Sequence, residues 1–300
     1  MTTSDEHAER FMLLRPLLFT IAYEILGSAT ESDDVLQDSY LRWAQVDLAE
    51  VQDTKSYLAR LVTRQALNAL RAGARRREDY VGPWLPEPLL IDEADPEADV
   101  VLAESVSMAM LVVLETLNPD ERAVFVLREV FAFDYDEIGS AVGKSAAAAR
   151  QIAHRAREHV QARRKRFQPV DPQQSEQITA QFLAAAASGD VDALIGMLAP
   201  DVKWTADGGG RVSAARKPVI GAAKVARAIV GLMQRGLPSL PDVRIELVTC
   251  NSGPALLVYS GDRLDVVIAV EVVDGKIANF YAIRNPEKLA TATVRRKITR

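Results

Sequence analysis

The stretch DYDEIGSAVGKSAAAARQIAHRARE, residues 134–158, limits most tightly what this chain can fold into. An amphipathic segment ends at a Gly-Lys-Ser break, and a second helical segment rich in arginine follows it. Gly143 suits the tight turn between two helices, and Gly139 lets the two helices cross closely. Ile152 and Ala156 are spaced to face inward. The pattern predicts a helix-turn-helix.

The second helix of this pair has a polar face suited to a nucleic acid. Arg150, His154 and Arg157 are spaced by four and three residues, and Gln151 lies beside them. Such a face in a major groove reaches base edges and phosphates. We predict DNA contacts at these four residues. An ordinary helical hairpin is the alternative, because many such hairpins mimic the pattern and a lone histidine is more often structural.

The net charge of −5 hides two basic blocks. Residues 55–77 hold seven basic residues and no acid, and residues 150–166 hold seven against Glu158 alone. Between them, residues 78–121 hold twelve acids and no base. The pattern predicts two surfaces that face a polyanion, joined by a solvated connector. If either basic block is considered alone, the alternative is that it is only the solvent-exposed face of a helix. Local positive potential suffices for phosphate attraction, so the net charge does not exclude it.

Apolar periodicity predicts further helices in the first half of the chain. They cover residues 8–26, 30–45 and 54–72, and the second opens at TESD, which has the spacing of a capping box. Prolines and acids mark residues 79–104 as a linker. The sequence NPDE then starts helical structure that continues to about residue 166.

Residues 169–300 have a different pattern. Two helices and a strand are followed by another helix and by apolar runs typical of strands. The last run contains Asp274-Gly275, a strong hairpin signal. Helices followed by antiparallel strands predict an α+β domain.

Several function classes are disfavoured. The single cysteine, Cys250, excludes an intrachain disulfide and predicts a small buried residue in a reducing compartment. Acids near the start and the lack of an 18-residue apolar run predict a soluble cytoplasmic protein that does not enter membranes. We expect no metal and no cofactor, because no ligand cluster or phosphate-binding glycine motif occurs. All three histidines precede residue 160, so the tail lacks an Asp–His acid–base pair. Catalysis by Asp207 acting without a histidine is the alternative, and we expect no enzyme activity.

Three segments resemble bacterial sigma factors of the extracytoplasmic-function type. LNPDERAVFVLREVFAFDYDEIGSAVGKSAAAARQIAHRARE resembles region 4, which reads the −35 promoter element. ESDDVLQDSYLRWAQ resembles region 2.2, which docks on the polymerase clamp, and SYLARLVTRQALNALRAGARRRE resembles regions 2.3 and 2.4, which melt and read the −10 element. The resemblance implies two all-α sigma domains, region 2 over 1–78 and region 4 over 105–168, with a linker over 79–104. A fused, cone-shaped α+β domain of the SnoaL-like type then covers 169–300.

The resemblance also implies partners and roles for individual residues. The partners are promoter DNA and the RNA polymerase core, through its clamp helices and flap. Docking on the core is implied for Asp34, Gln37, Asp38 and Leu41. For Asp34, as for the neighbouring Asp33, stabilisation of the helix N-terminus is the alternative role. Contact with the −10 element is implied for Tyr57, Arg60, Arg64, Arg71, Arg75 and Arg76. Tyr57 is either a stacking platform for an unpaired base or a core residue, and Arg64 replaces an asparagine common among relatives, which leaves the identity of the captured base open.

The fused domain is implied to regulate the sigma domains in place of a separate anti-sigma factor. WLPEPL, DGGG and NPEKL support this close resemblance. We expect these stretches to meet through Trp84, Leu85, Pro86, Asp207, Gly208, Gly209, Gly210, Asn285 and Pro286. Packing of Trp84 on the helical domains is the alternative. The sequence does not indicate whether the tail domain binds a small ligand. The basic residues 295–300 are expected to form a solvated chain end.

Two other functions remain as alternatives. A helix-turn-helix regulator that never contacts polymerase leaves residues 31–45 and the arginine helix at 55–77 unexplained. An enzyme with a DNA-binding front end conflicts with the missing histidine of the tail.

Overall fold

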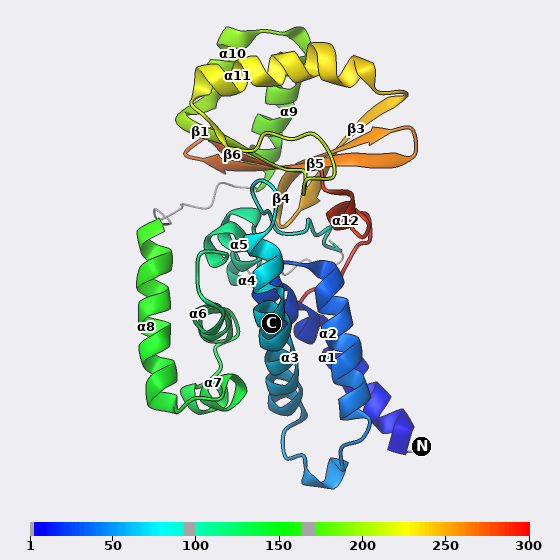
Figure 1. The fold of residues 1–300 in the computed structure, drawn as a ribbon, viewed down its shortest axis with the longest axis vertical. Coiled ribbons are helices and arrows are strands. Elements are labelled where there is room, and N and C mark those ends of the chain that lie inside the picture. Colours follow the sequence, from blue (N-terminus) through cyan, green and yellow to red (C-terminus); the bar gives the residue numbers. More distant parts are fainter. Residues whose placement is uncertain (1–2, 93–99, 164–171) are drawn as a thin grey trace.

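The computed structural model describes residues 3–92, 100–163 and 172–300, except for the side chains of residues 3–4 and 74–76. Three parts follow one another along the chain, and Figure 1 shows the last of them above the two helical parts. We name them the N-terminal bundle (α1–α3), the helix-turn-helix unit (α4–α8) and the tail domain (α9–α12). The expected order of two helical domains and one α+β domain is confirmed.

Three helices form the N-terminal bundle: α1 (Thr3–Leu26), α2 (Ala29–Trp43) and α3 (Thr54–Glu78), with a short 3₁₀ turn at Leu48–Glu50. Their apolar faces bury side chains such as Tyr23, Trp43 and Leu58 completely. The predicted capping box at Thr30 is wrong. Ser28 caps α2, because its backbone is extended and its hydroxyl accepts the amide of Glu31, whereas Thr30 lies within the first turn.

The helix-turn-helix unit contains α4 (Val100–Ser105), α5 (Met108–Leu114), α6 (Pro119–Phe125), a π turn (Val126–Val130), α7 (Tyr135–Val142) and α8 (Ala146–Arg163). Gly143 ends α7 with φ 71°, a left-handed conformation that favours glycine. A Cβ on Gly139 would lie 2.7 Å from the carbonyl oxygen of Lys144, so only glycine fits at the crossing. The predicted helix-turn-helix is confirmed.

A mixed six-stranded sheet forms the tail domain with helices on one face. Its elements are α9 (Pro172–Ser188), α10 (Val191–Met197), β1 (Leu198–Asp207), β2 (Val219–Ile220), α11 (Ala222–Gly231), β3 (Val243–Cys250), β4 (Gly253–Ser260), β5 (Arg263–Val273), β6 (Lys276–Ile283) and α12 (Pro286–Leu289), with short helical turns at Leu232–Gly236 and Leu237–Ser239. The strand order is β2-β1-β6-β5-β4-β3, and β1 is parallel to β6 while the other pairs are antiparallel. Asp274 and Gly275 both have positive φ, which confirms the predicted hairpin. The α+β domain is confirmed.

The two faces of this sheet have different coverings. Phe182 of α9 and Val225 of α11 pack with Phe280 on one face. On the other face, Leu85, Leu90 and Met108 pack among strand residues, together with the buried Cys250 and residues of α12. The tail domain therefore uses one sheet face for its own helices and the other for the rest of the chain.

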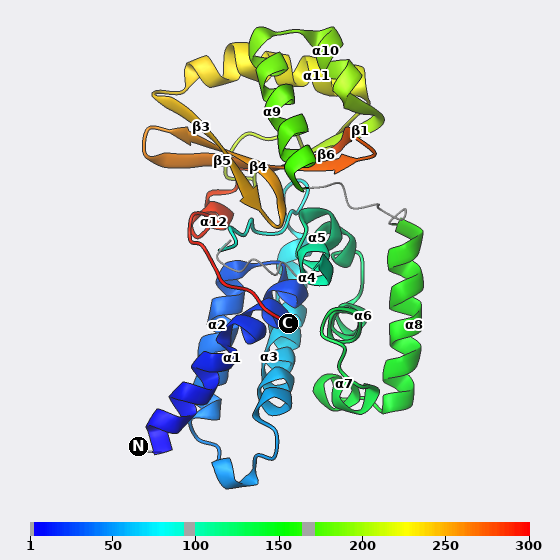
Figure 2. The ribbon, with the colours of Figure 1, turned by 180° about the vertical axis from the view of Figure 1, so that it is seen from behind.

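The C-terminal residues return to the helical parts, as Figure 2 shows. The backbone of Arg296 pairs with Leu90 and Asp92, and its guanidinium forms an ion pair with Asp33 of α2 at 2.7 Å. The amide of Thr299 donates to the hydroxyl of Thr20 in α1. The expected solvated end is wrong, because the main chain of these residues finds hydrogen-bond partners on the linker and α1.

Candidate functional site

The outer face of α2 is open. Asp34, Gln37, Asp38 and Leu41 are all exposed, while Val35, Leu36, Ser39 and Trp43 face the core. Leu41 exposes 56% of its surface, so this face combines acids with an apolar side chain available to a partner. Asp33 differs from its neighbours because Arg15 and Arg296 pair with it.

The polar face of α3 lies against the helix-turn-helix unit. Ser56 donates to Glu137 at 2.5 Å, and Arg60 donates to Ser140 at 3.3 Å. Farther along α3, Arg71 donates to Asp120 at 2.6 Å. Apolar residues of α3, α6 and α7 also share one core. The helix that carries the first basic block therefore packs directly on the second helical part.

Other residues predicted on this face differ in their surroundings. Tyr57 is half-buried and packs against Trp43, while the guanidinium of Arg60 lies over its ring, so it is partly a core residue. Arg64 is exposed and has no hydrogen-bond or ion-pair partner among the described residues. The side chains of Arg75 and Arg76 lie outside the described part of the chain.

Asp120 joins the two helical parts through opposite charges. It accepts from Arg71 of α3 and lies 3.1 Å from the ammonium group of Lys144, which follows the turn glycine. Partial burial alone raises the pKa of Asp120, but hydrogen bonds from both cations outweigh burial and hold the pKa below its usual value. The carboxylate of Asp120 thus links α3 to the turn between α7 and α8.

The outer face of α8 is accessible. Arg150, Gln151 and His154 are exposed. The guanidinium of Arg150 lies over the ring of Tyr135 at 5.0 Å. Arg157 donates to Glu129 of its own unit at 2.6 Å and remains 42% exposed. Nδ1 of His154 lies 3.4 Å from the carboxylate of Glu158. Among the described residues, Arg150 and Gln151 therefore have no carboxylate partner, whereas His154 and Arg157 each have one.

A buried aspartate joins the linker to the tail domain. Asp207, at the end of β1, is fully buried and accepts from Tyr80 at 2.5 Å, from the amide of Leu85 at 2.9 Å and from Lys288 at 2.8 Å. Burial lowers the pKa of Lys288, and the charge of Asp207 opposes this effect. The structure brings WLPEPL, DGGG and NPEKL together around this ion pair.

Trp84 touches two parts of the chain. The ammonium group of Lys288 lies 3.3 Å from the centroid of a Trp84 ring, and the guanidinium of Arg77 in α3 lies at 4.8 Å. Tyr80 packs edge-on against the same indole. Trp84 therefore contacts both the tail domain and the N-terminal bundle.

The glycines after Asp207 permit a close approach. A Cβ on Gly209 would lie 2.4 Å from the amide nitrogen of Asn285, and one on Gly208 would lie 2.5 Å from the carbonyl oxygen of Val212. Gly209 and Gly210 both have positive φ. Asn285 caps α12 and donates to Tyr80, Pro86 is buried, and Pro286 is exposed in the first turn of α12. A Cβ on Gly209 would also lie 2.9 Å from the hydroxyl of Tyr80, so a larger side chain there would push the linker away from the tail domain.

Sequence reasoning missed Asn251, which meets three segments. Its side chain accepts from the amide of Leu89 and donates to Tyr23 and to the carbonyl oxygen of Val106, all within 2.9 Å. It is 1% exposed and has φ 52°. Asn-Ser-Gly between two strands is an ordinary turn signal, so the sequence carried no sign of this role.

Glu87 of WLPEPL was also missed. Its carboxylate accepts from Ser28 and from the amide and hydroxyl of Thr30, at the start of α2. The linker thereby holds the N-terminus of the helix whose open face was described above. The available signal was an acid within an otherwise apolar, proline-rich stretch.

A buried acid lies between α1 and the helix-turn-helix unit. Glu24 of α1 accepts from Ser105 of α4, and its backbone carbonyl accepts from the buried Arg122 of α6. Burial raises the pKa of Glu24 to about 8, against a smaller opposing effect of Ser105 and Arg122. This acid is therefore protonated near neutral pH.

The described residues contain neither a candidate metal cluster nor a helix that could span a membrane. No grouping of three or more histidine, cysteine or acidic side chains there is arranged to hold a metal ion. Within those same ranges, every helix is too short or too polar to span a bilayer.

Known proteins show the same order of parts. Residues 11–76 match the family model "Sigma-70 region 2", and residues 107–160 match "Sigma-70, region 4". The ECF RNA polymerase sigma factor SigJ of Mycobacterium tuberculosis is 37% identical over 302 residues, covering 96% of this chain and 94% of SigJ. A probable ECF sigma factor, SigI, from the same organism is 29% identical and covers 96% of this chain and 97% of its own length.

A solved structure extends the agreement to three dimensions. The crystal structure of M. tuberculosis SigJ matches with a TM-score of 0.76 at 33% identity, and it covers 96% of this chain and 100% of that one. The open face of α2, the basic face of α3 and the arginine-bearing α8 occur here within the two matched sigma-70 regions. The chain therefore belongs to the extracytoplasmic-function RNA polymerase sigma factors.

Proposed function

We propose that α2 docks on the clamp of core polymerase, that α3 contacts the −10 element and that α8 contacts the −35 element. The exposed Asp34, Gln37, Asp38 and Leu41 support the first role. The basic faces of α3 and α8 support the other two, since arginine binds phosphates and base edges. We assign region 2 to residues 1–78, the linker to 79–104, region 4 to 105–168 and the regulatory domain to 169–300, with the polymerase flap as the partner of region 4 and the cytoplasm as the compartment.

The observed arrangement is a closed state of this sigma factor. One observation carries this conclusion: Ser56, Arg60 and Arg71 of α3 are hydrogen-bonded to the helix-turn-helix unit. The same side chains are unable to contact a promoter strand while they hold these partners. Binding to polymerase and DNA therefore requires the two helical parts to separate.

The tail domain acts as a built-in regulator. It fixes the linker through Asp207 and Asn251, and the linker in turn caps α2 through Glu87. A domain on the same chain acts at a high effective concentration, so a modest affinity is enough. The tail is not an enzyme in this proposal, because Asp207 is buried with its carboxylate bound to Lys288, Tyr80 and Leu85.

Run-off transcription with purified core polymerase tests the function. We expect transcripts that depend on the full chain and that fall at least tenfold for Asp38→Arg, while the matched control Glu176→Arg, on the exposed face of α9, stays unchanged. Equal transcription without the chain contradicts the proposal. A strong band shift with no effect of core polymerase favours the helix-turn-helix regulator instead. Trp84→Ala is expected to change transcription because it loosens the linker from Lys288.

A further inference from the structure

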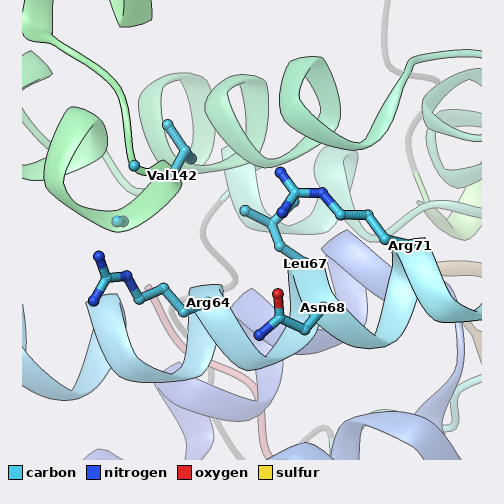
Figure 3. A pocket seen from close by; sticks show the side chains of 7 residues that line it. Arg64, Leu67, Asn68, Arg71 and Val142 are labelled. Carbon is cyan, nitrogen blue, oxygen red and sulfur yellow. The ribbon is translucent and has the colours of Figure 1, made fainter.

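The contact between α3 and the helix-turn-helix unit leaves a cleft of about 320 Å³, which we name the interdomain cleft. One wall is α3, with Arg64, Leu67, Asn68 and Arg71. The other wall is the end of α7 and its turn, with Val142 and Gly143. Figure 3 shows Arg64 and Arg71 extending from α3 toward the opposite wall, with Leu67 between them. Small-molecule sites commonly lie between domains and begin at about this volume.

The charge of the interdomain cleft favours an anion. Its lining contains two guanidinium groups and no carboxylate. Arg64 has no partner within the described ranges, and Arg71 is 49% exposed although it is paired with Asp120. Because Lys144 also pairs with Asp120, the nearby carboxylate is fully neutralised and a net positive charge remains.

The interdomain cleft is longer than a single phosphate ion. Arg64 and Arg71 are seven residues apart on α3, about 10 Å along the helix. The aliphatic side chains of Leu67 and Val142 line the cleft between them. The side chain of Asn68 adds an amide that pairs with the edge of a base. Guanidinium groups bind phosphates in a bidentate manner and also stack on bases.

We propose that the interdomain cleft binds a nucleoside phosphate, with the phosphates on a guanidinium group and the base against Leu67 and Val142. The ligand touches both helical parts, so it binds the closed arrangement and stabilises it by mass action. The consequence for promoters rests on the proposed function: the ligand occupies Arg64, and both Arg64 and the paired Arg71 are then withheld from the −10 strand. Binding itself does not depend on that function.

Isothermal titration of the full chain, without polymerase, DNA or divalent metal, tests the proposal. The probes are ADP, GDP, adenosine and inorganic phosphate. We expect at least one diphosphate to bind one site per chain, with adenosine and phosphate each at least tenfold weaker. Arg64→Gln is expected to weaken binding of that nucleotide at least tenfold, and Arg227→Gln, an exposed arginine on α11, is expected to leave it unchanged.

Each other outcome overturns the site. Absence of nucleotide binding does so directly, as does equal binding of inorganic phosphate, which indicates a site for any small anion. Equal losses in Arg64→Gln and Arg227→Gln place binding elsewhere. Because Arg64 is exposed and has no ion-pair partner in the described part of the chain, its replacement is expected to leave the fold intact, which circular dichroism verifies. Failure here leaves the transcription assay unaffected, and failure of that assay leaves this titration interpretable.

Discussion

The two joints of this molecule are built differently. Where the tail domain meets the linker, Asp207, Lys288 and Asn251 are almost completely buried and hydrogen-bonded. Where α3 meets the helix-turn-helix unit, polar contacts such as Arg71–Asp120 remain partly exposed beside the open interdomain cleft. Burial makes an ion pair costly to break, whereas exposed pairs contribute about 0–1 kcal/mol. The polar contacts of the first joint are therefore the costlier to break, although the second joint also shares an apolar core that has to part when it opens.

The largest effect is expected for Asp207→Ala. Removing this carboxylate leaves Lys288 buried without its charge partner, which costs about 3–5 kcal/mol of unfolding free energy. Urea denaturation followed by circular dichroism measures the loss. Asp201→Ala, at an exposed position on the same strand, is the control with no expected effect. Adding Lys288→Met to Asp207→Ala is expected to recover part of the loss, and failure of this rescue argues against the ion pair as the cause.

A smaller loss of about 1–3 kcal/mol is expected for Asn251→Gly, because the buried amide of Leu89 and the carbonyl oxygen of Val106 lose the side chain that pairs with them. Glycine keeps the positive φ of this position, so strain does not contribute. Hydrogen exchange at the amide of Leu89 is expected to accelerate. Ser252→Gly, at the next residue with positive φ, is the matched control. Equal effects of the two changes would contradict the role of the Asn251 side chain in joining these segments.

Glu24 predicts a pH dependence at the boundary between α1 and the helix-turn-helix unit. Its pKa is about 8 in the folded chain against 4.5 for the free side chain, so the folded state binds more protons between these values. Stability from this group is complete below about pH 4.5 and declines as the pH rises toward 8. Glu24→Gln is expected to raise the thermal midpoint at pH 8 and to flatten its fall between pH 5 and 8. An unchanged slope contradicts the raised pKa.

The smallest effect is expected at the opening joint. Asp120→Asn removes the charge that holds Arg71 and Lys144, and it shifts the equilibrium toward separation by up to about 1 kcal/mol. Affinity of the full chain for promoter DNA, measured by fluorescence anisotropy at low salt, is expected to rise up to about fivefold. Asp136→Asn makes the same charge change on an exposed position of α7 and serves as the control. An equal rise in both variants indicates general charge repulsion from DNA rather than opening.

Local patterns predicted most of the elements. The turn at Gly143, the hairpin at Asp274 and the buried Cys250 follow from side-chain size, backbone freedom and periodicity, all of which are readable in the sequence. The predicted cap of α2 was misplaced, because two nearby hydroxyl residues fit the motif and only the backbone of Ser28 is extended.

Contacts between distant segments were harder to predict. The motif residues Leu85 and Asp207 were expected to meet because of a resemblance, and no periodicity relates them. Nothing in the sequence indicated the contacts made by Asn251 and Arg296. Asn251 pairs with the backbone amide of Leu89 and Arg296 pairs with the carboxylate of Asp33, and each partner is more than 150 residues away along the chain. The packing of α3 on α7 was not expected either, because a basic helix face indicates a polyanion and not a neighbouring domain.

Locking the opening joint tests the closed state most directly. Ser56→Cys and Glu137→Cys, combined with Cys250→Ser, replace two side chains whose oxygens lie 2.5 Å apart. Because a cysteine is shorter than a glutamate, a short cross-linker reversible by dithiothreitol spans the remaining distance between the two thiols. Native Cys250 is buried with a pKa raised to about 12, so its replacement removes only a minor background reaction. We predict that the cross-linked full chain supports at least tenfold less run-off transcription with core polymerase and that dithiothreitol restores it. Full transcription by the completely cross-linked protein would contradict the account.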